Sequence, residues 1–114
     1  MRPILPSLKE KKRYLAFEII SKSKIKAFSQ VSKAIWNSVL SLVGENGAGA
    51  MGLWVLPEKY NDKKQKGIIR ANNRWLEALK ASLGLIIEIE KQPVIVRSLG
   101  ASGILQKAEE KYIK

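Results

Sequence analysis

The segment Tyr14–Ile20, with the sequence YLAFEII, decides the fold class of this chain. Its odd-numbered residues are leucine, phenylalanine and isoleucine, whereas its even-numbered residues include a tyrosine, an alanine and a glutamate. Because successive side chains of an extended chain point to opposite faces, this period of two predicts a strand with one face more apolar than the other. A strand of this kind lies in a sheet whose two faces are covered unequally.

Outward from this strand, the same two kinds of periodicity predict the remaining elements. Further strands are expected at residues 50–56, 66–71 and 92–99, and helices at 24–43, 73–87 and 104–113. Glycines at 44, 47 and 49 are expected to end the first helix and continue as a loop. The expected caps are Ser21 or Ser23 for the first helix and Asn72 or Asn73 for the second.

The resulting order, β-α-β-β-α-β-α, predicts an α+β fold. Short right-handed crossovers place two helices on one face of a four-stranded antiparallel sheet. This is the ferredoxin-like, RNA-recognition-motif-like βαββαβ sandwich, here with an extra C-terminal helix. We expect a single domain over residues 11–114 and a flexible arm over 1–10, where Pro3 and Pro6 block regular structure.

The charge of the chain is strongly one-sided, with 21 lysines and arginines against 10 acidic residues and a net charge of +11. Such a positive field favours polyanions, so RNA, DNA and anionic membranes are the candidate partners. Adaptation to heat is an alternative, but it raises glutamate together with lysine. A one-sided excess is not explained by adaptation alone.

The residue types that most often perform chemistry are scarce. The chain has no cysteine and no histidine, and Asp62 is its sole aspartate. This excludes disulfides, thiolate nucleophiles and the usual zinc sites, and it argues against a catalyst acting alone or a cofactor bound by the protein. No apolar stretch reaches the ~18 residues that span a bilayer and no secretory signal is present, so we expect a cytoplasmic protein without a membrane segment.

Basic residues at or in the predicted strands are the candidate phosphate contacts. An arginine fork matches phosphate geometry, and strands hold its position. For Arg70 and Arg97, which interrupt apolar strands, an ion pair with a nearby glutamate is the structural alternative. The candidate RNA-binding residues outside the C-terminal turn are Lys11, Lys12, Arg13, Lys66, Arg70 and Arg97.

The segment Leu99–Gly103, with the sequence LGASG, is predicted to turn from a strand into a helix N-terminus. Ser102 could cap that helix, and the glycines would let an anion approach free backbone N–H groups. Arg97 before the turn and Lys107 after it would complete a phosphate-binding site. A tight turn without a ligand is an equally good interpretation.

Base stacking has weaker support in the sequence. Tyr14 is the only good stacking residue expected on the open face of the sheet. Trp54 could lie near the sheet edge, but filling the core is the favoured role for it. A second apolar stripe on the first helix, Trp36, Leu40 and Val43, predicts either a protein partner or packing under the C-terminal helix.

Four segments together resemble the archaeal ribonuclease P protein component 2 family. They are KKRYLAFEII (11–20), AIWNSVLSLVGENGAG (34–49), KGIIRA (66–71) and VIVRSLGASGILQKAEEKYI (94–113). The resemblance implies a non-catalytic subunit of the RNA-based endoribonuclease that removes the 5′ leader of precursor tRNA, in which the RNA uses Mg²⁺. The implied partners are ribonuclease P RNA, protein component 3 and other ribonuclease P proteins, with a homodimer or a dimer of heterodimers possible.

Three other functions remain open on the residues alone. The chain could be an RNA-binding subunit of another ribonucleoprotein, or a protein–protein adaptor whose charge is incidental. An autonomous nuclease is the third, and the single aspartate argues against it.

Overall fold

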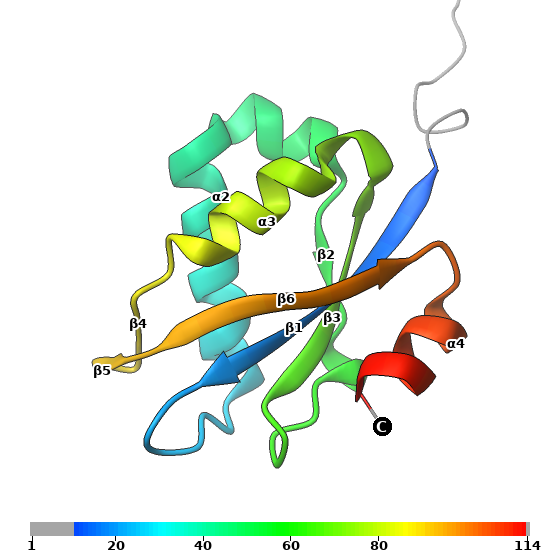
Figure 1. Ribbon diagram of the computed structural model, residues 1–114. Coiled ribbons are helices and arrows are strands. Elements are labelled where there is room, and N and C mark those ends of the chain that lie inside the picture. The colour runs from blue at the N-terminus through cyan, green and yellow to red at the C-terminus, as the bar shows by residue number, and fades with distance from the viewer. Residues whose placement is uncertain (1–10, 114) are drawn as a thin grey trace, which may run out of the picture.

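The computed structural model describes residues 11–113, so the arm expected at 1–10 lies outside the described residues. The main sheet is antiparallel and has the strand order β2-β3-β1-β6, with β1 and β3 in the centre (Figure 1). The predicted ferredoxin-like α+β sandwich is therefore confirmed. The strands are β1 (Lys12–Ile20), β2 (Trp54–Val55), β3 (Lys66–Asn72) and β6 (Ile95–Ser102), and the two long helices are α2 (Phe28–Met51) and α3 (Leu76–Gly84).

The first face of the sheet packs against α2 and α3. The predicted alternation in β1 holds, since Leu15, Phe17 and Ile19 all lie in the main hydrophobic core. Ile69 of β3, which pairs with Leu15, belongs to the same core. Burial of these large apolar side chains, at about 25 cal/mol per Å² of apolar surface, is the main force that holds the helices to the sheet.

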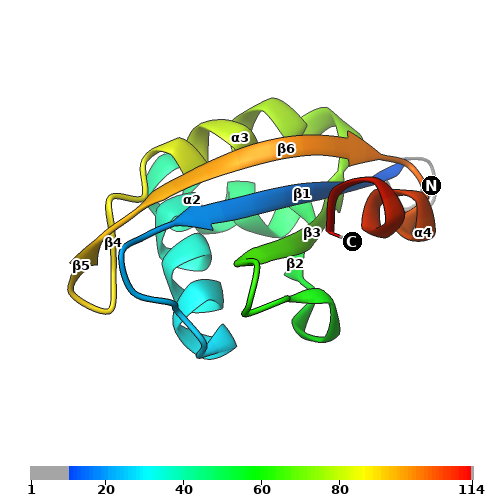
Figure 2. The same cartoon turned by 60° about the horizontal axis from the view of Figure 1, so that its bottom comes forward.

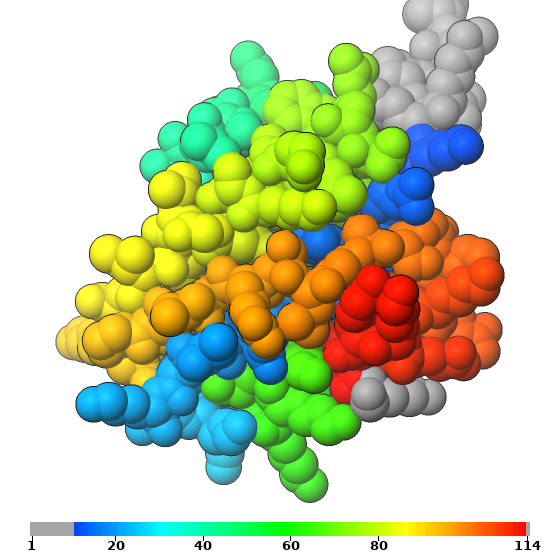
Figure 3. Space-filling view, viewed as in Figure 1, coloured from blue at the N-terminus to red at the C-terminus, as the bar shows by residue number. Residues whose placement is uncertain are grey.

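The C-terminal helix covers the opposite face of the sheet. It consists of α4 (Leu105–Ala108) continued by the π-helical turn Glu109–Ile113. Ala108 and Ile113 form a second core with Ala16 of β1 and Ile68 of β3. Figure 2 shows this helix lying against β6 and β1, and Figure 3 shows it packed beside β6 at the surface. The centre of the face that RNA-recognition motifs use for stacking is therefore closed by the chain itself.

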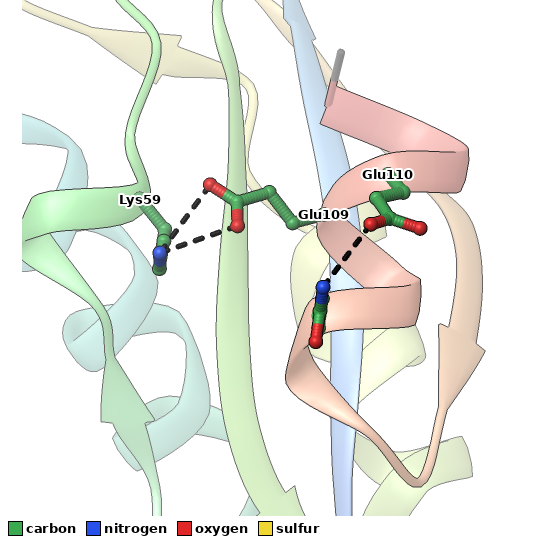
Figure 4. A network of polar contacts seen from close by, with 4 residues as sticks. Lys59, Glu109 and Glu110 are labelled. Carbon is green, nitrogen blue, oxygen red and sulfur yellow. Dashed lines mark hydrogen bonds and ion pairs between the residues drawn. The ribbon is translucent and has the colours of Figure 1, made fainter.

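An ion pair also attaches this helix to the segment after β2. Lys59, in the single 3₁₀ turn Pro57–Lys59, lies 3.3 Å from both carboxylate oxygens of Glu109 (Figure 4). Both side chains are about three-quarters buried, with exposed fractions of 25% and 26%. The pair therefore ties the C-terminal helix to the segment between β2 and β3.

The first helix differs from the predicted one at both ends. It begins at Phe28 rather than Lys24, and Ala27 precedes it without a side-chain cap, so the expected serine caps are wrong. It also continues past Gly44 to Met51, with a kink where Gly44 adopts φ 76° and ψ 176°. The predicted glycine loop is therefore wrong, and glycine at 44 supplies a left-handed φ that other residues rarely adopt.

The strands after the kinked helix are also placed differently. The strand expected at 50–56 is reduced to Trp54–Val55, because Met51 still belongs to α2. The segment expected to extend α3 to residue 87 instead leads into a hairpin of β4 (Glu88–Ile89) and β5 (Gln92–Pro93). The fourth sheet strand then begins at Ile95.

Gln65 joins the start of β3 to the segment before α2. Its side-chain amide donates to the Ile19 carbonyl at 3.0 Å, and its carbonyl accepts from the Ile25 N–H at 2.6 Å. Gln65 is 3% exposed. These bonds satisfy a backbone group at the end of β1 and one before α2, so Gln65 holds the crossover from β1 to α2.

Candidate nucleic-acid interface

One row of residues crosses the whole sheet on the face that carries the C-terminal helix. Trp54 of β2 pairs with Arg70 of β3, Arg70 pairs with Tyr14 of β1, and Tyr14 pairs with Ser102 of β6. Residues that pair in this way have neighbouring side chains on one face. The row lies toward the end of the sheet where β1 begins, beyond the second core.

Arg70 is the residue of this row with an unsatisfied polar group. Its Nε atom is buried and has no hydrogen-bond partner within residues 11–113. Within the same residues no carboxylate pairs with its guanidinium, so the ion pair considered from the sequence is not found for Arg70. Arg70 as a whole is half-buried, and because no acid among the described residues neutralises its guanidinium, its charge favours an anion as partner.

Lys12 and Arg13 lie at the same end of the sheet and are held by two asparagines. The Lys12 ammonium donates to the Asn72 side-chain carbonyl, and Arg13 Nε donates to Asn73 Oδ1 at 3.1 Å. Asn72 also donates to the Ala50 carbonyl at 2.7 Å, which ties it to the end of α2. Neither asparagine caps a helix through its side chain, contrary to the prediction. They position two cations instead. Neither cation forms a salt bridge with an acidic side chain among the described residues.

The other candidate arginine is in a different electrostatic setting. Arg97 Nε donates to Glu18 Oε1 at 2.8 Å, so the structural alternative predicted for Arg97 is confirmed. Lys66 pairs with Glu18 on the opposite side of β1. Lys66 and Arg97 therefore flank an acid near the far end of the sheet, and the structure does not bring them together with Arg13 and Arg70.

The LGASG segment is not the turn that the sequence predicts. Gly100 to Ser102 continue β6 and pair with β1 from Ala16 to Tyr14. Ser102 does not cap α4, which Ile104 precedes; the Ser102 hydroxyl accepts instead from the Ile104 N–H at 3.1 Å. The phosphate-binding site predicted from backbone N–H groups is therefore absent from residues 100–103. Ser102 still lies in the row with Arg70.

Lys11 and Lys107 complete the set of basic candidates, and both are exposed. Lys11 precedes β1 at the end of the sheet that holds Lys12 and Arg13, and its carbonyl accepts from the Asn73 N–H at 2.7 Å. Lys107 lies on α4. The structure thus gathers Lys11, Lys12, Arg13, Arg70 and Ser102 at one end of the sheet, a group that we call the β1-start cluster.

The apolar stripe on α2 faces its own core rather than the C-terminal helix. Trp36 and Val43 are partly buried against the main core, whereas Leu40 is 37% exposed. The alternative that these residues pack under the C-terminal helix is wrong, because that helix lies on the opposite face of the sheet. Leu40 is therefore the part of the stripe open to a partner, and Leu42, which was not part of the predicted stripe, is exposed near it on α2 at 44%.

Trp54 is the residue for which the less favoured alternative holds. It is 53% exposed and lies in the edge strand β2, so the position at the sheet edge is confirmed and the expectation that it fills the core is wrong. Tyr14, expected to be the stacking residue, is partly buried beside the second core. The alternation in the segment Met51–Val55 would have placed Trp54 opposite its buried neighbours and was the available signal.

Two further properties of the described residues bear on other functions. No helix within residues 11–113 has the length and apolarity needed to cross a membrane. The same residues contain no group of three or more histidine, cysteine, aspartate or glutamate side chains that could hold a metal ion.

Comparison with known proteins identifies relatives along nearly the whole chain. Ribonuclease P protein component 2 of Thermococcus kodakarensis is 33% identical over 108 residues, covering 95% of this chain and 88% of the relative. The protein of the same name from Pyrococcus horikoshii is 32% identical, covering 99% of this chain and 92% of the relative. The protein of that name from Methanobrevibacter smithii is 31% identical, and the match covers 100% of this chain and 98% of the relative.

A solved structure supports the fold. A chain in the cryo-EM structure of yeast ribonuclease MRP superposes with a TM-score of 0.64 at 18% identity, covering 82% of this chain and 75% of that chain. The family model for the Rpp14/Pop5 family matches residues 13–113. The resemblance drawn from the four sequence segments is thereby confirmed, and the chain belongs to the Rpp14/Pop5 family.

Proposed function

We propose that this chain is a non-catalytic protein subunit of ribonuclease P that binds the RNA of that enzyme through the β1-start cluster. Family membership supports the assembly, since its relatives bear the name ribonuclease P protein component 2. The observation that carries the RNA contact is Arg70, whose buried Nε lacks an acceptor within residues 11–113 and which lies at the same end of the sheet as the two cations held by Asn72 and Asn73.

The mechanism is electrostatic. Lys12, Arg13 and Arg70 offset phosphate repulsion where RNA strands pack closely, and this lowers the concentration of Mg²⁺ that the RNA needs to fold. Because Lys12 and Arg13 are already held by hydrogen bonds, less side-chain entropy is lost when phosphate binds. The protein adds positioned charge, and the RNA with its Mg²⁺ performs the cleavage.

The assembly also requires protein partners. Leu40 and Leu42 are exposed on α2, on the side of the molecule away from the C-terminal helix. This apolar surface is our candidate contact for ribonuclease P protein component 3 or for a second copy of the chain in a dimer of heterodimers. RNA and protein would then use different surfaces.

The test of RNA binding is titration of the full chain with ribonuclease P RNA at several salt concentrations. Arg70→Gln should weaken binding at least tenfold and reduce the slope of log affinity against log salt by about 0.7–0.9. Lys80→Gln, which removes one positive charge from α3, is the matched control and should change affinity less than twofold. Equal effects of the two variants would refute the β1-start cluster as the RNA contact.

A further inference from the structure

The indole of Trp54 is exposed on the edge strand, and packing in the core does not account for it. Trp54 is 53% exposed, although it directly precedes the buried Val55 and Leu56. It pairs across strands with Arg70, whose buried Nε has no partner within residues 11–113. An open aromatic face beside an unsatisfied cation is a combination that a ligand with a flat ring and a negative charge would match.

The rest of the row supplies polar groups. Tyr14 and Ser102 continue the row beyond Arg70. The Ser102 hydroxyl accepts a hydrogen bond from the Ile104 N–H at 3.1 Å, and its own proton remains free to donate. A ribose or phosphate oxygen is a suitable acceptor for that proton.

The position of the C-terminal helix limits where such a ligand can lie. Tyr112 packs on Gly100 and Ile113 belongs to the second core, so the middle of this face is occupied. Trp54 lies on the edge strand, one row nearer the start of β1 than the covered pair Ala16 and Ile68. Adjacent strands are about 4.8 Å apart, so a base on Trp54 leaves its phosphate within reach of Arg70.

We propose that Trp54 and Arg70 form a site for one unpaired nucleotide of RNA, with the base stacked on the indole and the phosphate bound by the guanidinium. This inference rests on the proposed function and adds that the contact is to single-stranded rather than paired RNA. The local charge favours RNA over a protein partner, because Lys12 and Arg13 lie at the same end of the sheet without an acidic partner among the described residues. Stacking tolerates any base, so we expect little sequence preference.

The experiment compares binding of the full chain to a single-stranded oligoadenylate of ten nucleotides and to a ten-base-pair RNA duplex. Trp54→Leu should weaken binding to the single strand about 5- to 150-fold, the equivalent of the ~1–3 kcal/mol that one stacked base contributes. Trp54→Phe keeps an aromatic face and should lose less than Trp54→Leu. Duplex binding should change less than twofold in both variants.

Tryptophan fluorescence gives a second readout. The chain has three tryptophans, and the quenching that the single strand causes in the wild type should be absent in Trp54→Phe. Because Trp54 is half exposed, its replacement should leave the urea unfolding midpoint nearly unchanged, which shows that the fold is intact. A large fall in that midpoint would assign Trp54 to the structure and overturn the inference.

The remaining outcomes are distinct. Equal loss of single-strand and duplex binding in Trp54→Leu would overturn stacking, as would unchanged binding to both. Loss of a ribonuclease P protein partner with RNA binding intact would assign Trp54 to a protein interface and also overturn the proposal. The proposed function fails separately, if the wild-type chain has no salt-dependent affinity for ribonuclease P RNA.

Discussion

Tyr112 packs directly against Gly100, so closely that a Cβ atom at position 100 would collide with the tyrosine ring and hydroxyl. Gly100 pairs with Ala16 in the centre of the sheet. The absence of a side chain at Gly100 therefore lets the C-terminal helix reach the sheet surface. This contact closes the middle of the face and leaves the row of Trp54 and Arg70 at its end.

Gly100→Ala should destabilise the protein by displacing Tyr112. Overpacking of this kind costs about 1–3 kcal/mol of the free energy of unfolding, measured by urea denaturation. Gly84→Ala is the matched control: a Cβ atom there meets nothing within 4 Å, so stability should stay the same or rise by up to ~1 kcal/mol. In a Tyr112→Ala background the effect of Gly100→Ala should shrink. An undiminished effect there would show that the clash lies elsewhere.

Arg70 and Arg97 should contribute differently to RNA binding. Arg97 is 60% exposed and already pairs with Glu18, whereas Arg70 has no partner within residues 11–113. We expect Arg97→Gln to reduce affinity for ribonuclease P RNA less than threefold and Arg70→Gln at least tenfold. The Arg97 change should cost no more than ~1 kcal/mol of stability, as for other exposed ion pairs. The reverse order of the two affinities would move the RNA contact to the far end of the sheet.

Gln65→Leu should be strongly destabilising although it adds an apolar side chain. It leaves the Ile19 carbonyl and the Ile25 N–H without partners in a buried site. Each unsatisfied group costs about 1–3 kcal/mol, so the expected loss in the free energy of unfolding is ~2–5 kcal/mol. Asn61→Ala, in the exposed turn before Gln65, should cost less than half as much. A loss below ~1 kcal/mol for Gln65→Leu would show that water can replace the amide.

Tyr60 should make stability depend on pH in the alkaline range. Burial, followed by the charges of Asp62 and Glu90, raises the pKa of Tyr60 from 10.0 to about 12. The folded state therefore holds its proton longer than the unfolded state, and the stability that this contributes is complete below pH 10 and lost as pH rises toward 12. Tyr60→Phe, which also removes the hydrogen bond to the Ile25 carbonyl, should flatten this part of the stability curve. If the free energy of unfolding fell equally steeply with pH in both proteins, the raised pKa of Tyr60 would be contradicted.

The sequence was sufficient for the sheet and the two long helices because their apolar periods are long and regular. It failed where tertiary contacts override local preference. Gly47 lies in α2 and not in a loop, and its missing side chain gives room to the side chain of Val43. The hairpin of β4 and β5 was missed because Glu90 and Lys91 take positive φ at its turn without the usual asparagine–glycine signal.

The candidate site was predicted in part. The register of β1 and β3 places Lys12, Arg13 and Arg70 at the same end of the sheet, with Lys12 and Arg70 on the face of the C-terminal helix and Arg13 on the other face. The pairing of Arg97 with Glu18 and the exposure of Trp54 depend on which strands are neighbours and which is the edge. Neither follows from the pattern of a single strand.

Cleavage of precursor tRNA by reconstituted ribonuclease P tests the central claim most directly. The assay contains ribonuclease P RNA and the other protein subunits, with the wild-type chain, the Arg70→Gln variant or no chain, across a range of Mg²⁺ concentrations. We predict that the wild-type chain lowers the Mg²⁺ concentration needed for 5′ leader removal. The Arg70→Gln variant should need a higher Mg²⁺ concentration than the wild-type chain, but a lower one than the assay without the chain. Cleavage that is the same with and without the chain at every Mg²⁺ concentration would contradict the account.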